Sequence, residues 1–134
     1  MGYTAAVTDD RQTLGTLGER IAARWLAAQG WQLLAVRWRS GHRDLDLVVR
    51  LGDLVAFVEV KARRGTLFGD PVEAVTWRKR RELVRSAQAW IDRCGRPGEA
   101  YRFDVVGVLV TGRGATARVR VRHVPDAFQV PARS

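Results

Sequence analysis

The central segment "DLDLVVRLGDLVAFVEVK", residues 44–61, predicts a β-hairpin. Two apolar runs flank Gly52-Asp53, and glycine in the first position of a two-residue turn favours type II′. With this turn Leu51 faces Leu54, and a shift of one residue would mix the two faces of both strands. On one face every opposed pair is apolar, namely Val49–Ala56, Leu47–Val58 and Leu45–Val60.

The other face of this hairpin carries charges. The same register sets Asp46 opposite Glu59 and Asp44 opposite Lys61. Directly opposed carboxylates destabilise a sheet, and partial burial raises the pKa of one of them. A cation between Asp46 and Glu59 would remove this conflict, and Mg²⁺ (or Mn²⁺) suits a site with two carboxylates, waters and substrate phosphates. Alternatively, Lys61 simply neutralises Asp44 at an ordinary strand end.

Lysine is rare in this chain, because only Lys61 and Lys79 among the 23 basic residues are not arginine. An ammonium group has three movable donors and a pKa that its surroundings can shift, whereas a guanidinium stays charged. We therefore expect Lys61 to orient or help deprotonate an attacking water, or to offset phosphate charge.

The net charge of +9 predicts an anionic partner, most simply nucleic acid. The alternative is an arginine-rich surface with no binding role. Phosphate contacts are expected from arginines that follow the second hairpin strand or lie on the next helix: Arg63, Arg64, Arg78 and Arg81.

Periodicity along the chain predicts an α/β fold, with a mixed β-sheet flanked by helices in the order αβββαββ. Helices are expected at 13–29 and about 71–93, the second starting after Asp70 or Thr76, and strands at 31–38, 44–50, 54–61, 102–110 and 116–123. Residues 13–124 form one domain in this interpretation, between a flexible N-terminal segment (1–12) and a C-terminal tail (125–134).

The composition excludes several other classes of protein. No apolar run reaches the roughly 18 residues of a membrane span, and the first residues lack the order of a signal peptide. A single cysteine, Cys94, makes no disulfide framework, and two scattered histidines make no zinc cluster. We expect a cytoplasmic protein without a membrane partner.

Four blocks of sequence resemble a known family: "LGERIAARWLAAQGW", "RWRSGHRDLDLV", "VAFVEVKAR" and "RFDVVGV". The chain resembles the YraN family of endonuclease-like bacterial proteins, within the PD-(D/E)XK nuclease superfamily and related to archaeal Holliday junction resolvases. The resemblance implies a restriction-endonuclease-like core. It also implies that Asp46 and Glu59 are metal ligands and that Lys61 is the catalytic lysine.

The resemblance adds Glu19 and Lys79 to the catalytic residues. Helical geometry alone places Glu19 about 140° from Leu14 and predicts a solvated side chain, while Lys79 also suits an ordinary basic helix face. The chain departs from the family pattern at three places: Arg43-Asp44 replaces Gly-Glu, Arg37 replaces asparagine, and Leu45 replaces the proline of the superfamily motif.

Two functions follow from these residues. The first is a metal-dependent endonuclease that hydrolyses phosphodiester bonds, with branched or structured DNA as substrate and DNA preferred over RNA. The second is an accessory module in repair or recombination that binds nucleic acid without cleaving it. Symmetric nicking of two strands would call for a homodimer.

Overall fold

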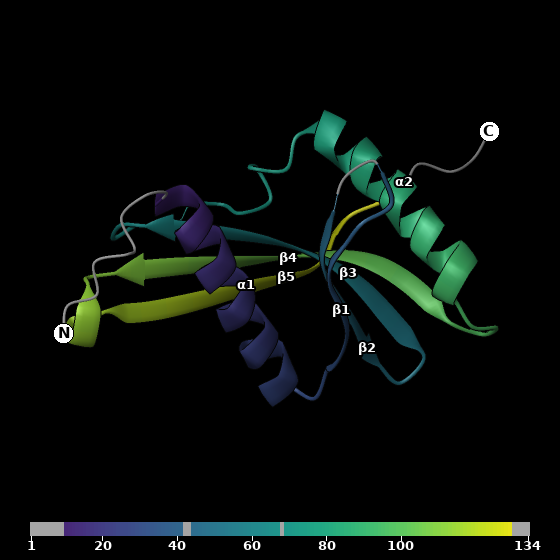
Figure 1. Cartoon of the computed structure of the whole chain (residues 1–134), viewed down its shortest axis with the longest axis horizontal. Helices are drawn as coiled ribbons and strands as arrows, with labels where there is room; N and C mark the ends of the chain where they lie inside the picture. The colour runs from purple at the N-terminus through teal and green to yellow at the C-terminus, as the bar shows by residue number, and fades with distance from the viewer. Residues whose placement is uncertain (1–9, 42–43, 68, 130–134) are drawn as a thin grey trace.

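The computed structural model describes residues 10–41, 44–67 and 69–129, which form a mixed five-stranded sheet with two α-helices (Figure 1). The elements are α1 (Asp10–Ala28), β1 (Gln32–Trp38), β2 (Leu45–Leu51), β3 (Leu54–Arg64), α2 (Trp77–Cys94), β4 (Ala100–Thr111) and β5 (Arg118–Phe128), with a 3₁₀ turn, η2 (Gly114–Thr116), before β5. This order confirms the predicted αβββαββ arrangement.

The strands lie in the order β1-β2-β3-β4-β5. Only β3 and β4 are parallel, and the other neighbours are antiparallel. Parallel neighbours need a long crossover connection, which α2 supplies. Figure 1 shows that the sheet twists strongly, so that its strands converge in the middle and spread toward both ends.

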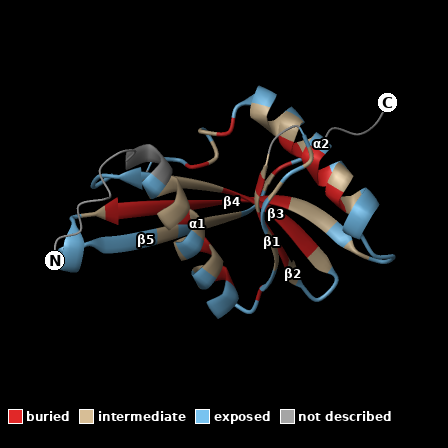
Figure 2. Ribbon diagram, in the orientation of Figure 1, coloured by how far each residue is buried: buried red, intermediate tan, exposed pale blue. Residues whose placement is uncertain are grey.

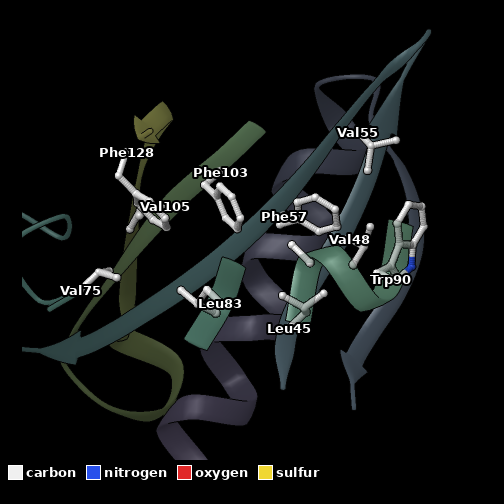
Figure 3. Packing of buried hydrophobic residues seen from close by; sticks show 11 residues of the cluster. Leu45, Val48, Val55, Phe57, Val75, Leu83, Trp90, Phe103, Val105 and Phe128 are labelled. Atoms are coloured by element: carbon white, nitrogen blue, oxygen red, sulfur yellow. The ribbon is translucent and has the colours of Figure 1, made fainter. Parts of the chain in front are cut away.

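The two helices cover different faces of the sheet and divide the core into two clusters. Ala22 and Leu26 of α1 are buried with residues such as Val58. Leu83 and Trp90 of α2 are buried in the other cluster, whose aromatic and branched side chains appear in Figure 3. Strand β4 contributes to both clusters, and Figure 2 shows it as the most continuously buried strand.

The hairpin of β2 and β3 has the predicted turn and register. Gly52 has a φ of +62°, as the first position of a type II′ turn requires. The ladder pairs continue in register from Leu51–Leu54 to Leu47–Val58. Beyond that pair the predicted face is wrong for Leu45. Alternation predicts it on the same face as Leu47 and Val49, which are in the α1 cluster, but it is buried in the α2 cluster. The ladder between β2 and β3 ends at Leu47–Val58, whereas β2 stays paired with β1 as far as Trp38–Leu45.

The predicted start of the C-terminal tail, at residue 125, is wrong. Strand β5 continues to Phe128, whose ring stacks on Phe103 with centroids 4.8 Å apart. The backbone N–H of Asp126 also donates to the buried Asp104. Residues 125–128 therefore belong to the domain, because a core ring and a buried carboxylate hold them. At the other end α1 begins at Asp10, three residues before the predicted start. Residues 1–9 and 130–134, as well as Arg43, lie outside the described residues.

The second helix is shorter than predicted. It begins at Trp77, and the hydroxyl of Thr76 caps it by accepting the N–H of Lys79 at 3.2 Å. Asp70, the other predicted cap, accepts the N–H of Val72 and closes a turn before the helix. Trp77 itself is 72% exposed, with the guanidinium of Arg80 over its ring, so it is not a core tryptophan.

Neither of the two helices resolved between residues 10 and 129 combines the length and apolarity that a membrane crossing demands.

Candidate active site

Asp46 lies in β2 just beyond the last backbone ladder pair with β3, and its carboxylate, in place of a backbone carbonyl, accepts the next hydrogen bond from β3. Its Oδ2 accepts the backbone N–H of Val60 at 2.8 Å. Because a strand's N–H groups point along the plane of the sheet, this bond places the carboxylate between the two strands. From there it contacts Glu59 of β3 and is close enough to Glu19 of α1 to be affected by its charge.

The surroundings of Asp46 strongly favour its protonated form. Burial, followed by the negative charge of Glu59 and a hydrogen bond with it, raises the pKa of Asp46 from 3.8 to about 8. The charge of Glu19 adds to this effect, and the Val60 N–H opposes it. The predicted conflict between Asp46 and Glu59 is therefore present, although the two residues meet beyond the last ladder pair.

Glu59 and Lys61 lie two residues apart in β3 and form an ion pair. The Nζ of Lys61 is 3.2 Å from Oε2 of Glu59, and the two side chains are 22% and 7% exposed. Asp44 instead pairs with Arg39, at 3.3 Å. The alternative in which Lys61 neutralises Asp44 is therefore wrong, because Asp44 has its own partner in the preceding segment.

Glu19 reaches the same region from α1 and is held there by Arg37. The Nε of Arg37 is 2.7 Å from Oε1 of Glu19, and its Nη2 donates to the Thr16 hydroxyl at 2.7 Å. The hydrogen bond and charge of Glu19, with smaller effects from Asp46 and Asp44, raise the pKa of Arg37. Arg37 thus places a positive charge beside three carboxylates.

The backbone of Arg37 adopts a φ of +50° within β1, which is uncommon for a residue other than glycine, asparagine or aspartate. Such conformations cost about 1–3 kcal/mol and persist where the surroundings demand them. Here the demand comes from α1, which holds the guanidinium at two points. The conformation also gives a physical reason for the asparagine expected at this position in the family pattern.

The predicted solvation of Glu19 is wrong because the side of α1 that packs on the sheet is wider than the predicted apolar stripe: Leu14 does pack against the core, but the most buried positions lie closer to Glu19. Leu14 is only partly buried, and the buried line of α1 runs through Gly18, Ala22 and Leu26. Gly18 lies so close to β3 that a Cβ there would come within 2.6 Å of the Cβ of Ala62. Glu19 is about 60° from Ala22 around the helix, and so it flanks the closest contact with the sheet.

The remaining predicted residues lie on α2 and at the end of β3. Lys79 is in the first turn of α2 and is half-buried. Arg63 and Arg64 are exposed at the end of β3, and Arg78 and Arg81 are exposed on α2.

Asp104 is buried but serves a structural purpose. Burial alone would raise its pKa, yet hydrogen bonds from His123, Arg102 and the Asp126 N–H together lower it. The two oxygens receive Arg102 at 2.9 and 3.1 Å and His123 at 2.7 Å. With its oxygens fully engaged, Asp104 ties the end of β5 to β4.

The acidic residues suit a hard cation that keeps some of its waters. No group of three or more His, Cys, Asp or Glu side chains within residues 10–41, 44–67 and 69–129 is placed to enclose a metal ion. Two adjacent carboxylates, Asp46 and Glu59, nevertheless match the way Mg²⁺ is held in phosphoryl-transfer sites, by one or two carboxylates, waters and substrate phosphates. Burial, followed by the charge of Glu59, raises the pKa of Asp46, and a cation beside the two carboxyl groups would oppose this effect.

The order of elements, the mixed sheet and the acidic residues around β2 and β3 define an α/β protein with a restriction-endonuclease-like core. Residues 18–108 match the family described as "Uncharacterised protein family UPF0102", and the chain belongs to this family. This is the YraN family of the sequence prediction, which is confirmed.

Bacterial relatives match about three quarters or more of the chain. A UPF0102 protein of Nocardia farcinica is 47% identical over 102 residues, which cover 76% of this chain and 80% of the relative. One of Rhodococcus jostii is 41% identical over 86% of this chain and 95% of the relative. One of Myxococcus xanthus is 37% identical, with 92% and 94% covered.

Sequence reasoning missed two contributors to the site. Arg37 was noted only as a departure from the family pattern, and Thr16 was not considered. The small residues Gly18 and Ala22, four apart on α1, were the signal that this side of the helix lies against the sheet. With that side known, Glu19 follows as its neighbour on the helix surface, and Thr16 lies beside Glu19, three residues before it.

Proposed function

We propose that this protein is a metal-dependent endonuclease that hydrolyses phosphodiester bonds, in DNA rather than RNA, with branched or otherwise structured DNA as its substrate. The observation that carries the proposal is the contact between Asp46 and Glu59 in a partly buried position, where burial, followed by the charge of Glu59 and the hydrogen bond with it, raises the pKa of Asp46 to about 8. Two carboxyl groups placed together in a partly buried site are unfavourable unless a cation joins them, and strongly shifted pKa values concentrate at functional sites.

Each residue of the site has a role in this proposal. Asp46 and Glu59 would hold Mg²⁺ (or Mn²⁺), which supplies stabilisation of phosphate charge and a lowered pKa for an attacking water. Lys61, kept beside Glu59, would donate to a phosphate oxygen or to that water. Glu19 would add a further acceptor, and Arg37 positions it.

Nucleic-acid binding in this proposal is electrostatic. Arg63, Arg64, Arg78 and Arg81 are exposed, and the net charge is +9. Each phosphate that they neutralise should add about 0.9 to the slope of log affinity against log salt on duplex DNA. Lys79, on the same helix as Arg78 and Arg81, would extend this surface toward the site.

Cleavage assays test the proposal directly. Purified protein is incubated with linear duplex, single-stranded and four-way-junction DNA, and with RNA, in Mg²⁺, in Mn²⁺ and in chelator. We expect metal-dependent products, most from the junction. Asp46→Asn should abolish them, whereas Asp53→Asn, at the exposed turn of the same hairpin, should not.

A second candidate is a nucleic-acid-binding module without catalysis. The pairing of Glu19 with Arg37 favours it, because an acid occupied by a guanidinium is less available for a metal. Salt-dependent binding with no cleavage in any metal would support this candidate and overturn the nuclease. Absence of binding at low salt would overturn both.

A further inference from the structure

A groove of about 410 Å³ lies beside the candidate active site, between α1 and the edge strand β1. Glu19 and Arg37, which contact each other at the site, also line this groove. Its volume falls within the roughly 300–1,000 Å³ of small-ligand pockets, so it suits a single nucleotide and is too small for a duplex.

The α1 side of the groove is cationic. Arg20 and Arg24 line it and are exposed, and Arg37 adds a third guanidinium. Glu19 is the only acid among the lining residues, and Arg37 already pairs with it. The groove therefore keeps a net positive charge, which complements the phosphates of a nucleic-acid strand.

The β1 side is apolar and exposed. Leu33 and Val36 line the groove and are 45% and 50% exposed. Residues three apart on a regular strand face opposite sides, but the register of β1 shifts between Leu33 and Ala35. This bulge brings both side chains to the groove, which thus gains an apolar wall opposite its arginines.

We propose that this groove binds one unpaired nucleotide of a nucleic-acid strand, with Leu33 and Val36 against the base and the arginines toward the flanking phosphates. The inference rests on the proposed function, because a strand seated here passes Glu19 and Arg37 on its way to Asp46 and Glu59. It adds a substrate class, namely DNA in which at least one nucleotide near the cleavage point is unpaired. A base buried in a duplex cannot enter the groove.

Binding measured in chelator tests this inference without any need for cleavage. The probes are one fluorescent DNA duplex with blunt ends and the same duplex with a single-stranded overhang, followed by fluorescence anisotropy. Val36→Asp places a negative charge on the apolar wall. Val119→Asp is the matched control, since Val119 is 45% exposed on β5, the opposite edge of the sheet.

We expect the parent to prefer the overhang. Val36→Asp removes an apolar contact with the base and places a negative charge near the phosphates, so it should weaken overhang binding by about fivefold or more. It should alter blunt-duplex binding no more than Val119→Asp does. Arg24→Ala should lower the salt slope with the overhang by about 1. Val36→Ser, which keeps the residue uncharged, replaces Val36→Asp if thermal melts show that the aspartate variant does not fold.

Three results would overturn the inference. The parent could bind the two probes with equal affinity, or the Val36 variants could lose the same affinity for both probes. The third is that the parent is a dimer and Val36→Asp converts it to a monomer. The last result would mean that a second copy of the chain covers the groove. If the protein never cleaves but Val36→Asp weakens binding to the overhang and not to the blunt duplex, the proposed function alone is contradicted. If the protein cleaves with metal but Val36→Asp does not selectively weaken overhang binding, only the proposal that the groove binds a nucleotide is contradicted.

Discussion

The Asp46 carboxylate takes the position of a ladder acceptor, because its Oδ2 accepts the Val60 N–H at 2.8 Å just beyond the last ladder pair of β2 and β3. The side chain is thereby held between the strands, where it meets Glu59 and experiences the charge of Glu19. The end of strand pairing thus creates the candidate site.

The first prediction concerns stability against pH. Burial and Glu59 raise the pKa of Asp46 from 3.8 to about 8. The folded state therefore binds this proton more tightly than the unfolded chain does. The stabilisation is complete below about pH 4 and is lost as the pH rises through about 8. Relative to Asp46→Asn, the parent should lose at least about 1 kcal/mol of unfolding free energy across this range. Urea unfolding at several pH values measures this, and parallel curves for the two proteins would contradict it.

The second prediction concerns metal and the same variant. In chelator at neutral pH, Asp46→Asn should melt at the same or a higher temperature, because it removes the conflict with Glu59 and keeps the shape of the side chain. Mg²⁺ should stabilise the parent by about 2.7 kcal/mol at a hundred times its dissociation constant, and the variant much less. Thermal melts with and without Mg²⁺ measure both effects. Strong destabilisation of the variant in chelator would show that Asp46 is a structural residue.

The third prediction concerns the identity of Lys61. Lys61→Arg keeps the charge beside Glu59 but replaces a compact, titratable ammonium by a planar group that stays protonated. Cleavage should fall about a hundredfold or more, as expected for loss of a proton-transfer group, while DNA affinity barely changes. Arg118→Lys, at an exposed position on the edge strand β5, is the control and should keep full cleavage. Parental activity in Lys61→Arg would reduce Lys61 to a counter-charge.

The fourth prediction concerns the approach of α1 to β3. A methyl group at Gly18 would lie 2.6 Å from the Cβ of Ala62, so Gly18→Ala should destabilise the protein by about 1–3 kcal/mol. Gly15→Ala in the same helix meets nothing within 4 Å and should stabilise it by about 0.5–1 kcal/mol through helix propensity. Chemical denaturation of both variants gives the comparison. Equal stability changes would mean that the helix can move away from the sheet without cost.

The fifth prediction concerns the left-handed backbone of Arg37, at φ +50°. Arg37→Ala and Arg37→Gly both lose the contacts with Glu19 and Thr16. The glycine variant should nevertheless be more stable by about 1 kcal/mol, since glycine adopts this conformation without strain. Arg122 is an exposed residue of β5 and serves as the control position. There the glycine variant should be less stable than the alanine variant, because glycine weakens a regular strand. Unfolding free energies of the four variants test this, and the same order at both positions would contradict it.

Local patterns alone determined much of this fold. The turn at Gly52 and the register from Leu51–Leu54 to Leu47–Val58 follow from alternation along two neighbouring strands. Local sequence limited the cap of α2 to Asp70 or Thr76, of which the structure has Thr76. Such features involve residues close in sequence, so the chain carries the information for them within a short segment.

Tertiary contacts decided the rest. The buried side of α1 is set by the close approach of Gly18 to Ala62, which brings Glu19 toward the site against its apparent position on an isolated helix. The end of β5 is ordered by Phe103 and Asp104, residues far from it in sequence. Periodicity describes each segment separately, whereas burial depends on which segments meet. For that reason sequence placed Asp46 and Glu59 side by side and a family resemblance pointed to Glu19, whereas only the packed structure showed that Arg37 holds Glu19 near them.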